Sequence, residues 1–482
     1  MVNFRRSLVI TFFSSSGSTI VQFIVSVILA RMLSPSEIGV FSMTVVFVNI
    51  AHIFRDFGVS TYLQREPVLT PEKMRAATGV MFTTSWIIAA GLYLASPWIS
   101  HWFEEPAMLP VMKVLAIGFL FIPFGAITQS LLTREFAAGK QAVVAVVGTS
   151  AFAVTCLGLA YLGFGALSMA WANLANIIAC AIACIPLRPR NLPWMPSFRH
   201  WRDVLHFGVG SLLSNCLTSI NNAIPDILLG KLGGATLVGL FSRASSTVSI
   251  FGYIAGSTVT YGSLSYLSQA HHRGEPLGPF LNRATSLVTA VGWPALGLTY
   301  VFSTEIVTTL YGEKWLPAVP AIDALVLASI ISLMFNYTSI ALTAIGRPYL
   351  SATPVIATLL TRIVFGIVLF NGEIESFSWA VCAATAAATP VIIYQHYAYL
   401  GHRFTTLLLA LWPSAVVTLC CVAAAFIFKT MLPLSLHAMS VLLVLALPLA
   451  CVWYAALRLS RHPFTGELHQ LANGLITRLR PV

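Results

Sequence analysis

Charged side chains are scarce in this sequence. Asp, Glu, Lys and Arg make up 9% of its 482 residues, whereas soluble domains carry about 25%. Hydrophobic residues account for 57%, and the mean hydropathy is +0.84. A soluble globular protein is therefore excluded, and the composition indicates a polytopic membrane protein.

Several chemical motifs are also missing. The sequence holds no G-x-x-x-x-G-K-[ST] segment, so we do not expect this chain to hydrolyse ATP at a phosphate-binding loop. Its eight cysteines fall within apolar runs and show no metal-ligand spacing, so we expect buried packing residues and no metal site. No cofactor is expected, apart from a coupling H⁺ or Na⁺.

Paired catalytic residues on large extramembrane loops are absent as well. A membrane-embedded polysaccharide polymerase, ligase or glycosyltransferase needs acid and base groups held across a site. Here the loops between apolar runs are short, and Glu104 and Glu105 are adjacent in the sequence. An enzyme is therefore the less favoured alternative.

The hydrophobic residues form long continuous runs. A hydrocarbon core of about 30 Å needs about 20 apolar residues per helix, and these runs are too long for the strands of an outer-membrane barrel. We expect an all-α integral membrane protein with about fourteen transmembrane helices. Their approximate extents are 8–30, 38–57, 76–96, 110–133, 142–162, 165–187, 206–229, 238–267, 281–303, 320–345, 350–371, 376–400, 405–428 and 436–458. The first run continues beyond "SSSGS" to Ala30, which favours a retained span over a cleaved signal peptide.

Lys and Arg are distributed unevenly among the loops. If the N-terminus is cytoplasmic, the inside segments carry 19 of these residues and the outside segments carry 5. Basic residues accumulate on the cytoplasmic side of membranes, so we expect both termini inside. The net charge of +11 is scattered over many short loops, which indicates contact with anionic membrane lipids and no nucleic acid.

One segment is echoed two hundred residues later. "LARMLSPSEIGVFS" at 29–42 aligns with "LGKLGGATLVGLFS" at 229–242, and Gly139 and Lys140 are echoed by Gly346 and Arg347. Six predicted spans separate the segment at 29–42 from its echo at 229–242. Parallel repeats related by an axis along the membrane normal are therefore predicted, with the substrate path between them.

The predicted organisation follows from this repeat. We expect two parallel six-helix repeats around a central cavity, plus two extra C-terminal helices. The ranges are 1–187 for the N-terminal lobe, 188–206 for a cytoplasmic interfacial linker, 207–400 for the C-terminal lobe, 401–458 for the two added helices and 459–482 for a cytoplasmic tail.

A family resemblance runs from about residue 8 to 400. Its motifs are "LARMLSPSEIGVFS", "RDFGVSTYLQREPVLTPE", "PDILLGKLGGATLVGLFSRA", "YGEKWLPAVPAI" and "AIGRP". In order and spacing they resemble the polysaccharide transporter (Wzx-type flippase) family of the multidrug, oligosaccharidyl-lipid and polysaccharide exporter superfamily. One departure is Pro225, which we expect to interrupt the helix over 206–229.

The resemblance implies a function and a location. It implies a flippase that moves undecaprenyl-diphosphate-linked oligosaccharide units of O-antigen, capsule or exopolysaccharide from the cytoplasmic to the periplasmic leaflet of a bacterial inner membrane by alternating access, with ion-gradient coupling. The polysaccharide polymerase and the chain-length machinery are implied partners. A drug or cation antiporter of the same superfamily is the nearer rival, and "DFGVSTYLQRE" argues against it.

Few charges lie inside the predicted spans. Each costs about 2.5 to 3.5 kcal/mol at the bilayer centre unless it has a partner or a watery cavity. Arg362 lies fifteen residues beyond Arg347, about 22 Å along a helix, too deep to snorkel easily. Because its guanidinium matches phosphate oxygens, we expect it to bind the lipid diphosphate; the alternative is a structural ion pair.

Other polar groups are secondary candidates. Arg243 and Arg55 lie near opposite boundaries, where each could contact substrate or snorkel to the interface. Asp226 and Asp323 could bind a coupling ion, or pair with Arg243. Asn173, Asn222 and Asn336 are candidates to hydrogen-bond sugar hydroxyls, although some such groups will be contacts between helices.

Overall fold

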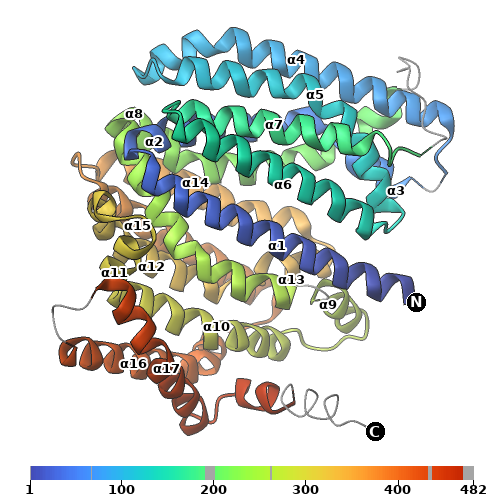
Figure 1. The fold of residues 1–482 in the computed structure, drawn as a ribbon. Coiled ribbons are helices and arrows are strands. Elements are labelled where there is room, and N and C mark those ends of the chain that lie inside the picture. The colour runs from blue at the N-terminus through green and yellow to red at the C-terminus, as the bar shows by residue number, and fades with distance from the viewer. Residues whose placement is uncertain (1, 67, 190–200, 261–262, 433–436, 471–482) are drawn as a thin grey trace, which may run out of the picture. The chain divides into compact units, whose positions relative to one another are not determined.

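A computed structural model describes residues 2–66, 68–189, 201–260, 263–432 and 437–470, and these residues form helices and connecting loops with no strand (Figure 1). The chain divides into two compact units, Met1–Gly239 and Leu240–Val482. The first unit contains α1 (Val2–Met32), α2 (Pro35–Asp56), α3 (Val59–Arg65), α4 (Pro71–Phe103), α5 (Met108–Arg134), α6 (Ala138–Tyr161), α7 (Ala166–Cys184) and the start of α8 (Trp201–Thr260).

The second unit begins within α8. It continues through α9 (Ser263–His272), α10 (Gly278–Val301), α11 (Ser303–Leu310), η1 (Glu313–Ala318), α12 (Val319–Met334), α13 (Thr338–Ala344), η2 (Pro348–Ser351), α14 (Ala352–Val368), α15 (Ile374–Leu400), α16 (Phe404–Met431) and α17 (Ala438–Leu459). The all-helical expectation is confirmed.

Twelve helical segments in the described part of the chain are long and apolar enough to cross a membrane. Two further features bring this number close to the approximately fourteen expected spans. Gly17–Met32 of α1 is a shorter apolar segment, and α8 consists of two helices joined at a kink, where Gly234 has φ 76° and ψ 178°. The expected interruption at Pro225 is wrong, because the helix runs through Pro225 and breaks at Gly234, whose missing Cβ permits this conformation.

In the first unit, α5 packs against both α4 and α7, and α6 packs against α1 and α7 (Figure 1). Helix α2 begins with a capping box, in which Glu37 N donates to Ser34 Oγ at 3.3 Å and Ser34 N donates to the Glu37 carboxylate at 2.7 Å. Pro35 fits the first turn because a proline has no N–H to satisfy there. The SPSE sequence thus determines where α2 begins.

Helix α2 also makes a close crossing with the part of α8 that follows the kink. A methyl group on Gly39 would overlap the carbonyl oxygen of Ala235 and lie 3.0 Å from the amide nitrogen of Gly239. A methyl group on Gly239 would overlap the carbonyl oxygen of Pro35 and lie 3.1 Å from the nitrogen of Gly39. Only glycine allows two backbones to approach this closely.

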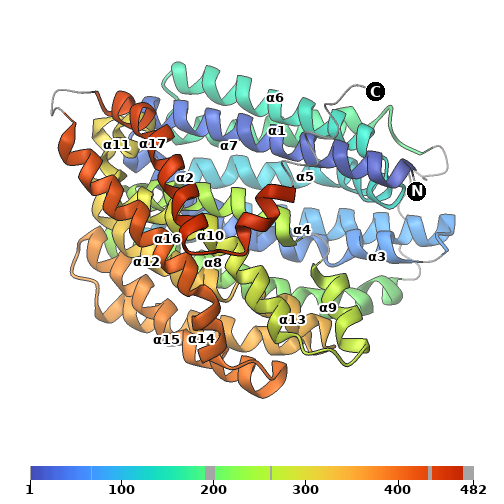
Figure 2. The same ribbon diagram turned by 90° about the horizontal axis from the view of Figure 1, so that it is seen from below.

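In the second unit, α10 packs on α16, α15 contacts α12 and α14, and α16 contacts α17. Figure 2 shows the short helices α9 and α13 side by side, and these two pack together. Trp315 of η1 is fully buried. Leu447 and Leu459 of α17 are 74% and 86% exposed, as expected for side chains that face lipid.

The expected lobe boundaries stay a prediction. The boundary between the two compact units falls within α8, after Gly239, whereas the repeat placed the linker at 188–206, of which residues 190–200 lie outside the described part. Residues 471–482 of the expected tail also lie outside it.

Candidate functional site

Arg243 is anchored to an aromatic ring. Its guanidinium carbon lies 5.9 Å from the ring centroid of Tyr311, a residue that is 2% exposed. Thr247, one turn further along α8, donates to the Arg243 carbonyl at 2.8 Å, and its Oγ1 lies 3.4 Å from Tyr311 Oη. Cation–π attraction therefore holds the half-buried guanidinium in place, and Tyr311 was not expected to have this role.

Arg55 lies in the last turn of α2. Its Nη1 is 3.5 Å from Met81 Sδ, and its carbonyl accepts a hydrogen bond from Thr84 Oγ1 at 2.8 Å. Asp56 accepts a bond from Ser60 Oγ at 2.5 Å. The end of α2 is thus tied to α3 and α4, and Arg55 is half-buried rather than extended into solvent.

Arg362 lies in the second half of α14 and is half-buried. The preceding residue, Thr361, has its hydroxyl 3.2 Å from the Ala384 carbonyl of α15. Leu360 and Val364 of the same helix are 58% and 53% exposed. Helix α14 is therefore packed on α15 along one side and open along another.

The two candidate acids occupy different surroundings. Asp226 is half-buried in α8, before the Gly234 kink. Asp323 is half-buried in α12 and lies close enough to Glu375 of α15 for the two carboxylates to interact. Two neighbouring carboxylates favour binding of a cation or a proton.

The candidate asparagines differ in exposure. Asn173 is half-buried in α7, Asn222 is exposed on α8, and Asn336 is exposed in the turn between α12 and α13. Four of the eight candidates (Arg55, Asn173, Asn222 and Asp226) belong to the first unit, and four (Arg243, Asp323, Asn336 and Arg362) belong to the second. A shared substrate path, and the pairing of Asp226 with Arg243, therefore stay predictions.

Two ion pairs at helix ends were not anticipated. Lys231 donates to Glu104 at 2.9 Å and to the Trp102 carbonyl at 2.8 Å. The hydrogen bond from Lys231 lowers the pKa of Glu104. Lys429 pairs with Glu305 at 2.7 Å. These partners lie more than a hundred residues apart, so local sequence patterns contained no signal for them.

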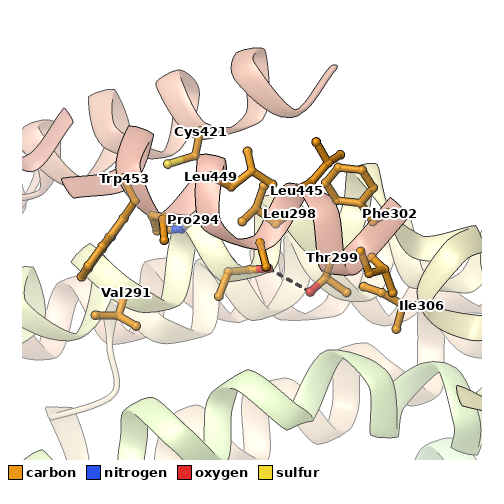
Figure 3. A pocket seen from close by; sticks show the side chains of 14 residues that line it. Val291, Pro294, Leu298, Thr299, Phe302, Ile306, Cys421, Leu445, Leu449 and Trp453 are labelled. Atoms are coloured by element: carbon orange, nitrogen blue, oxygen red, sulfur yellow. Dashed lines mark hydrogen bonds between the residues drawn. The ribbon is translucent and has the colours of Figure 1, made fainter. Parts of the chain in front are cut away.

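An apolar cavity of about 510 Å³ lies among α10, α11, α16 and α17 (Figure 3). Its polar side chains are already engaged: Thr299 Oγ1 donates to the Ala295 carbonyl at 2.8 Å, and Trp453 Nε1 donates to the Ala290 carbonyl at 2.9 Å. The rest of the lining is Val291, Pro294, Ala295, Leu298, Phe302, Ile306, Cys421, Leu442, Leu445, Ala446, Leu449 and Ala450. This lining suits a hydrocarbon chain and no charged group.

Comparison with known proteins agrees with the fold and the motifs. The chain is 24% identical to the teichuronic acid biosynthesis protein TuaB of Bacillus subtilis (strain 168) over 351 residues, which span 70% of each chain. It is 23% identical to the succinoglycan biosynthesis transport protein ExoT of Rhizobium meliloti (strain 1021), over 65% of this chain and 64% of the relative. It is 20% identical to the lipopolysaccharide biosynthesis protein WzxC of Escherichia coli (strain K12), over 64% and 63%.

Solved structures with the same fold are transporters. The lipid II flippase MurJ in an inward closed conformation matches with a TM-score of 0.75 at 14% identity, over 95% of this chain and 99% of that one. An inward-facing multidrug transporter of the MATE family matches with a TM-score of 0.62 at 16% identity, over 79% and 94%.

More than half of the chain matches one protein family. A family profile described as polysaccharide biosynthesis protein matches residues 28–320. Among these proteins ExoT is named as a transport protein, MurJ as a flippase and the MATE protein as a transporter, and none is named as an enzyme. The chain therefore belongs to the polysaccharide biosynthesis protein family, in agreement with the resemblance of its motifs, and it shares its fold with MurJ and the MATE transporters.

Proposed function

We propose that this chain is a flippase that carries undecaprenyl-diphosphate-linked oligosaccharide units from the cytoplasmic to the periplasmic leaflet of a bacterial inner membrane. The observation that supports this proposal most directly is the family match over residues 28–320. The printed names of its relatives refer to teichuronic acid, succinoglycan and lipopolysaccharide, which are all glycan polymers. The likeness to MATE transporters concerns the fold alone, so it does not favour a drug antiporter.

The chemistry of the substrate suggests distinct tasks for the polar and apolar parts of the protein. A diphosphate that leaves water needs positive charge and hydrogen-bond donors, and guanidinium groups supply both. Arg362, Arg243 and Arg55 are half-buried and are proposed for this task. The apolar cavity beside α17 is proposed to hold part of the prenyl chain, because its polar groups are already hydrogen-bonded.

Other residues are proposed to bind the sugar and the coupling ion. Asn173, Asn222 and Asn336 are proposed to hydrogen-bond sugar hydroxyls during alternating access. Asp226 and Asp323 are proposed to bind the coupling H⁺ or Na⁺, since a carboxylate in a span is costly without a cation. The polysaccharide polymerase and chain-length machinery are proposed to act on the delivered units, with both termini of the flippase in the cytoplasm.

The proposal can be tested with purified protein in liposomes. Lipid-linked repeat units would be placed in both leaflets, and an impermeant oxidant would attack only the sugars outside. In protein-free liposomes about half of the units should stay protected, whereas the flippase should make nearly all of them accessible, given an imposed H⁺ or Na⁺ gradient of the required direction. Protection equal to the protein-free control under both gradients would overturn the proposal.

A further inference from the structure

Two buried histidines meet at one end of the second unit. His396 lies in the last turn of α15 and His402 lies just beyond that helix; they are 5% and 3% exposed. Their Nδ1 atoms are 3.1 Å apart. The His396 carbonyl accepts the His402 N–H at 2.9 Å, and Gly401 adopts φ 60°, so the chain turns back and brings the second imidazole onto the first.

The two rings belong to a continuous chain of hydrogen bonds. At one end His402 Nε2 lies 2.8 Å from Asn282 Oδ1 of α10. At the other end His396 Nε2 lies 2.8 Å from Thr338 Oγ1, at the start of α13. The same hydroxyl lies 2.8 Å from the carbonyl oxygen of Phe335, just after the end of α12. This series of hydrogen bonds thus joins α10, the break between α12 and α13, and α15.

The geometry of these hydrogen bonds restricts the number of protons that the two imidazoles can carry. A neutral imidazole has one donor and one acceptor. Since Asn282 Oδ1 is an acceptor, His402 must donate from Nε2, and its Nδ1 must accept from His396. His396 Nε2 is then an acceptor and needs the proton of the Thr338 hydroxyl. The neutral chain therefore has one complete arrangement.

One added proton also finds a complete arrangement. Placed on His396 Nε2, it is donated to Thr338 Oγ1, and the Thr338 hydroxyl turns to the Phe335 carbonyl. The contact between the two Nδ1 atoms keeps a single shared proton. A second added proton would place N–H groups of both rings against each other, which is a repulsive contact.

We infer that His396 and His402 form a binding site for one proton, whose uptake rotates the Thr338 hydroxyl from His396 to the Phe335 carbonyl at the break between α12 and α13. The charge would lie at the carbonyl ends of α12 and α15, where a cation is stabilised. Phe335 N–H donates to the Ser332 carbonyl at 3.2 Å, and Thr338 N–H also donates to the Phe335 carbonyl at 3.1 Å. Protonation would therefore reinforce the turn that separates the two helices.

The surroundings keep the two imidazoles neutral until the pH falls. No ion pair among the described residues includes either imidazole. Burial lowers the pKa of His402. The ionisable groups on the neighbouring elements include Arg283 of α10, paired with Glu467 at 2.8 Å, Arg347 stacked over Tyr399 of α15, Tyr337 of the turn, Arg403 after His402, and His271 and His272 of α9. The acids Asp323 of α12 and Glu375 of α15 lie near the opposite ends of those helices. Because burial disfavours the charged imidazole, we expect the proton to bind only in acid.

The inference goes beyond the proposed function, because it concerns proton binding and needs no glycan. Deuterium exchange at the imidazole C2 position reports the protonation of each histidine by mass spectrometry. In the purified full-length protein we expect His396 and His402 to titrate together and take up one proton between them. Two independent transitions, each with an ordinary midpoint, would overturn the inference.

Variants at position 338 test the hydroxyl. Thr338→Val should lower the proton affinity of the pair about five- to tenfold, because a hydrogen bond to a charged group is roughly twice as strong as one between neutral groups. Thr338→Ser should restore the wild-type titration. Thr343→Val is the matched control, since its exposed hydroxyl bonds only Ser339 on the same helix. An unchanged midpoint in a folded Thr338→Val protein would contradict the proposed switch.

The test separates this inference from the flippase proposal. If the liposome assay failed, the shared titration would still be expected. If the histidines titrated independently while glycan transport proceeded, only the proton site would be lost.

Discussion

Gly39 and Gly239 contact each other through a reciprocal pair of backbone approaches. Gly39 lies against the Ala235 carbonyl, and Gly239 lies against the Pro35 carbonyl. Gly39 and Gly239 are 200 residues apart, as are Pro35 and Ala235, so each contact is the image of the other under the 200-residue offset of the sequence echo. Such reciprocity is the property of an isologous contact. The two segments are thus related by a local two-fold axis, whereas superposition of whole six-helix repeats stays a prediction.

The crossing of α2 and α8 should tolerate no side chain at Gly39 or Gly239. Gly39→Ala would push a methyl group into the Ala235 carbonyl, so we expect a loss of roughly 1 to 3 kcal/mol of stability, as for overpacked cores, and a lower melting temperature in detergent. Gly91→Ala in α4 is the matched control, because no heavy atom lies within 4 Å of the added carbon. Equal melting temperatures for the two variants would contradict the close approach.

Arg362 is expected to be required for export. Arg362→Ala should reduce surface polysaccharide roughly tenfold or more, because a lost hydrogen-bonded charge contact is worth about 1.5 to 3 kcal/mol, and lipid-linked units should accumulate in the inner leaflet. Arg362→Lys should retain part of the activity, since the charge survives without the planar fork.

Two measurements separate a substrate contact from a structural role for Arg362. Arg273→Ala makes the same chemical change at an exposed loop position and should leave export unchanged. Membrane levels of each variant should be compared, because loss of folded Arg362→Ala protein would favour a structural ion pair. Normal export by a well-expressed Arg362→Ala protein would exclude the phosphate-binding role.

The topology follows from the charge asymmetry of the loops. Reporter fusions after Arg202 and Arg347 should report the cytoplasm, and fusions near Glu104 and Lys314 should report the periplasm. Sites on the same side of the membrane must be separated by an even number of spans. Fusions on both sides are therefore needed to establish the orientation. A reversed result at two of these four positions would contradict the orientation.

His462 should make stability depend on pH. Its Nε2 lies 3.1 Å from Ser286 Oγ and 3.0 Å from Ser414 Oγ, and its Nδ1 accepts the Phe464 N–H at 3.0 Å. Burial lowers the pKa of His462 from 6.5 to about 4. The folded state therefore prefers the neutral ring, and its advantage is complete above the unfolded pKa and is lost as the pH falls from 6.5 towards 4.

Thermal melts across this pH range can test the role of His462. We expect acidification to cost roughly 1 to 2 kcal/mol after allowance for solvent screening. His462→Gln should lower stability at pH 7 and remove this part of the pH dependence. His469→Gln, at an exposed position, should preserve it. A pH profile of His462→Gln that matched the wild type would show that another group is responsible.

Much of the fold could be read from local patterns. Apolar runs of about 20 residues located the spans because the thickness of a bilayer sets their length. The second span was expected from residue 38, and the structure starts α2 at Pro35, where the capping box of Ser34 and Glu37 satisfies the first-turn donors. The expected spans 206–229 and 238–267 left an interruption between them, where Gly234 breaks α8, whereas the additional break expected at Pro225 is wrong because the helix accommodates this proline.

The candidate site was less accessible to such reasoning. The cost of a charge in a bilayer singled out Arg243, but nothing local indicated that Tyr311 would lie against its guanidinium. The ion pair of Glu104 and Lys231 likewise joins distant segments. Contacts of this kind depend on which faces of two helices meet.

By itself, the sequence determined the membrane class, the approximate number and limits of the spans, the family and the existence of two echoed segments, because hydropathy and motif order act over short stretches of chain. Only the tertiary structure decided that Gly39 and Gly239 contact each other, that Gly234 bends α8, and that His396 and His402 share a hydrogen bond. The physical reason is that hydrogen bonds and close packing act over a few ångströms, and only folding brings residues from separate helices within that distance.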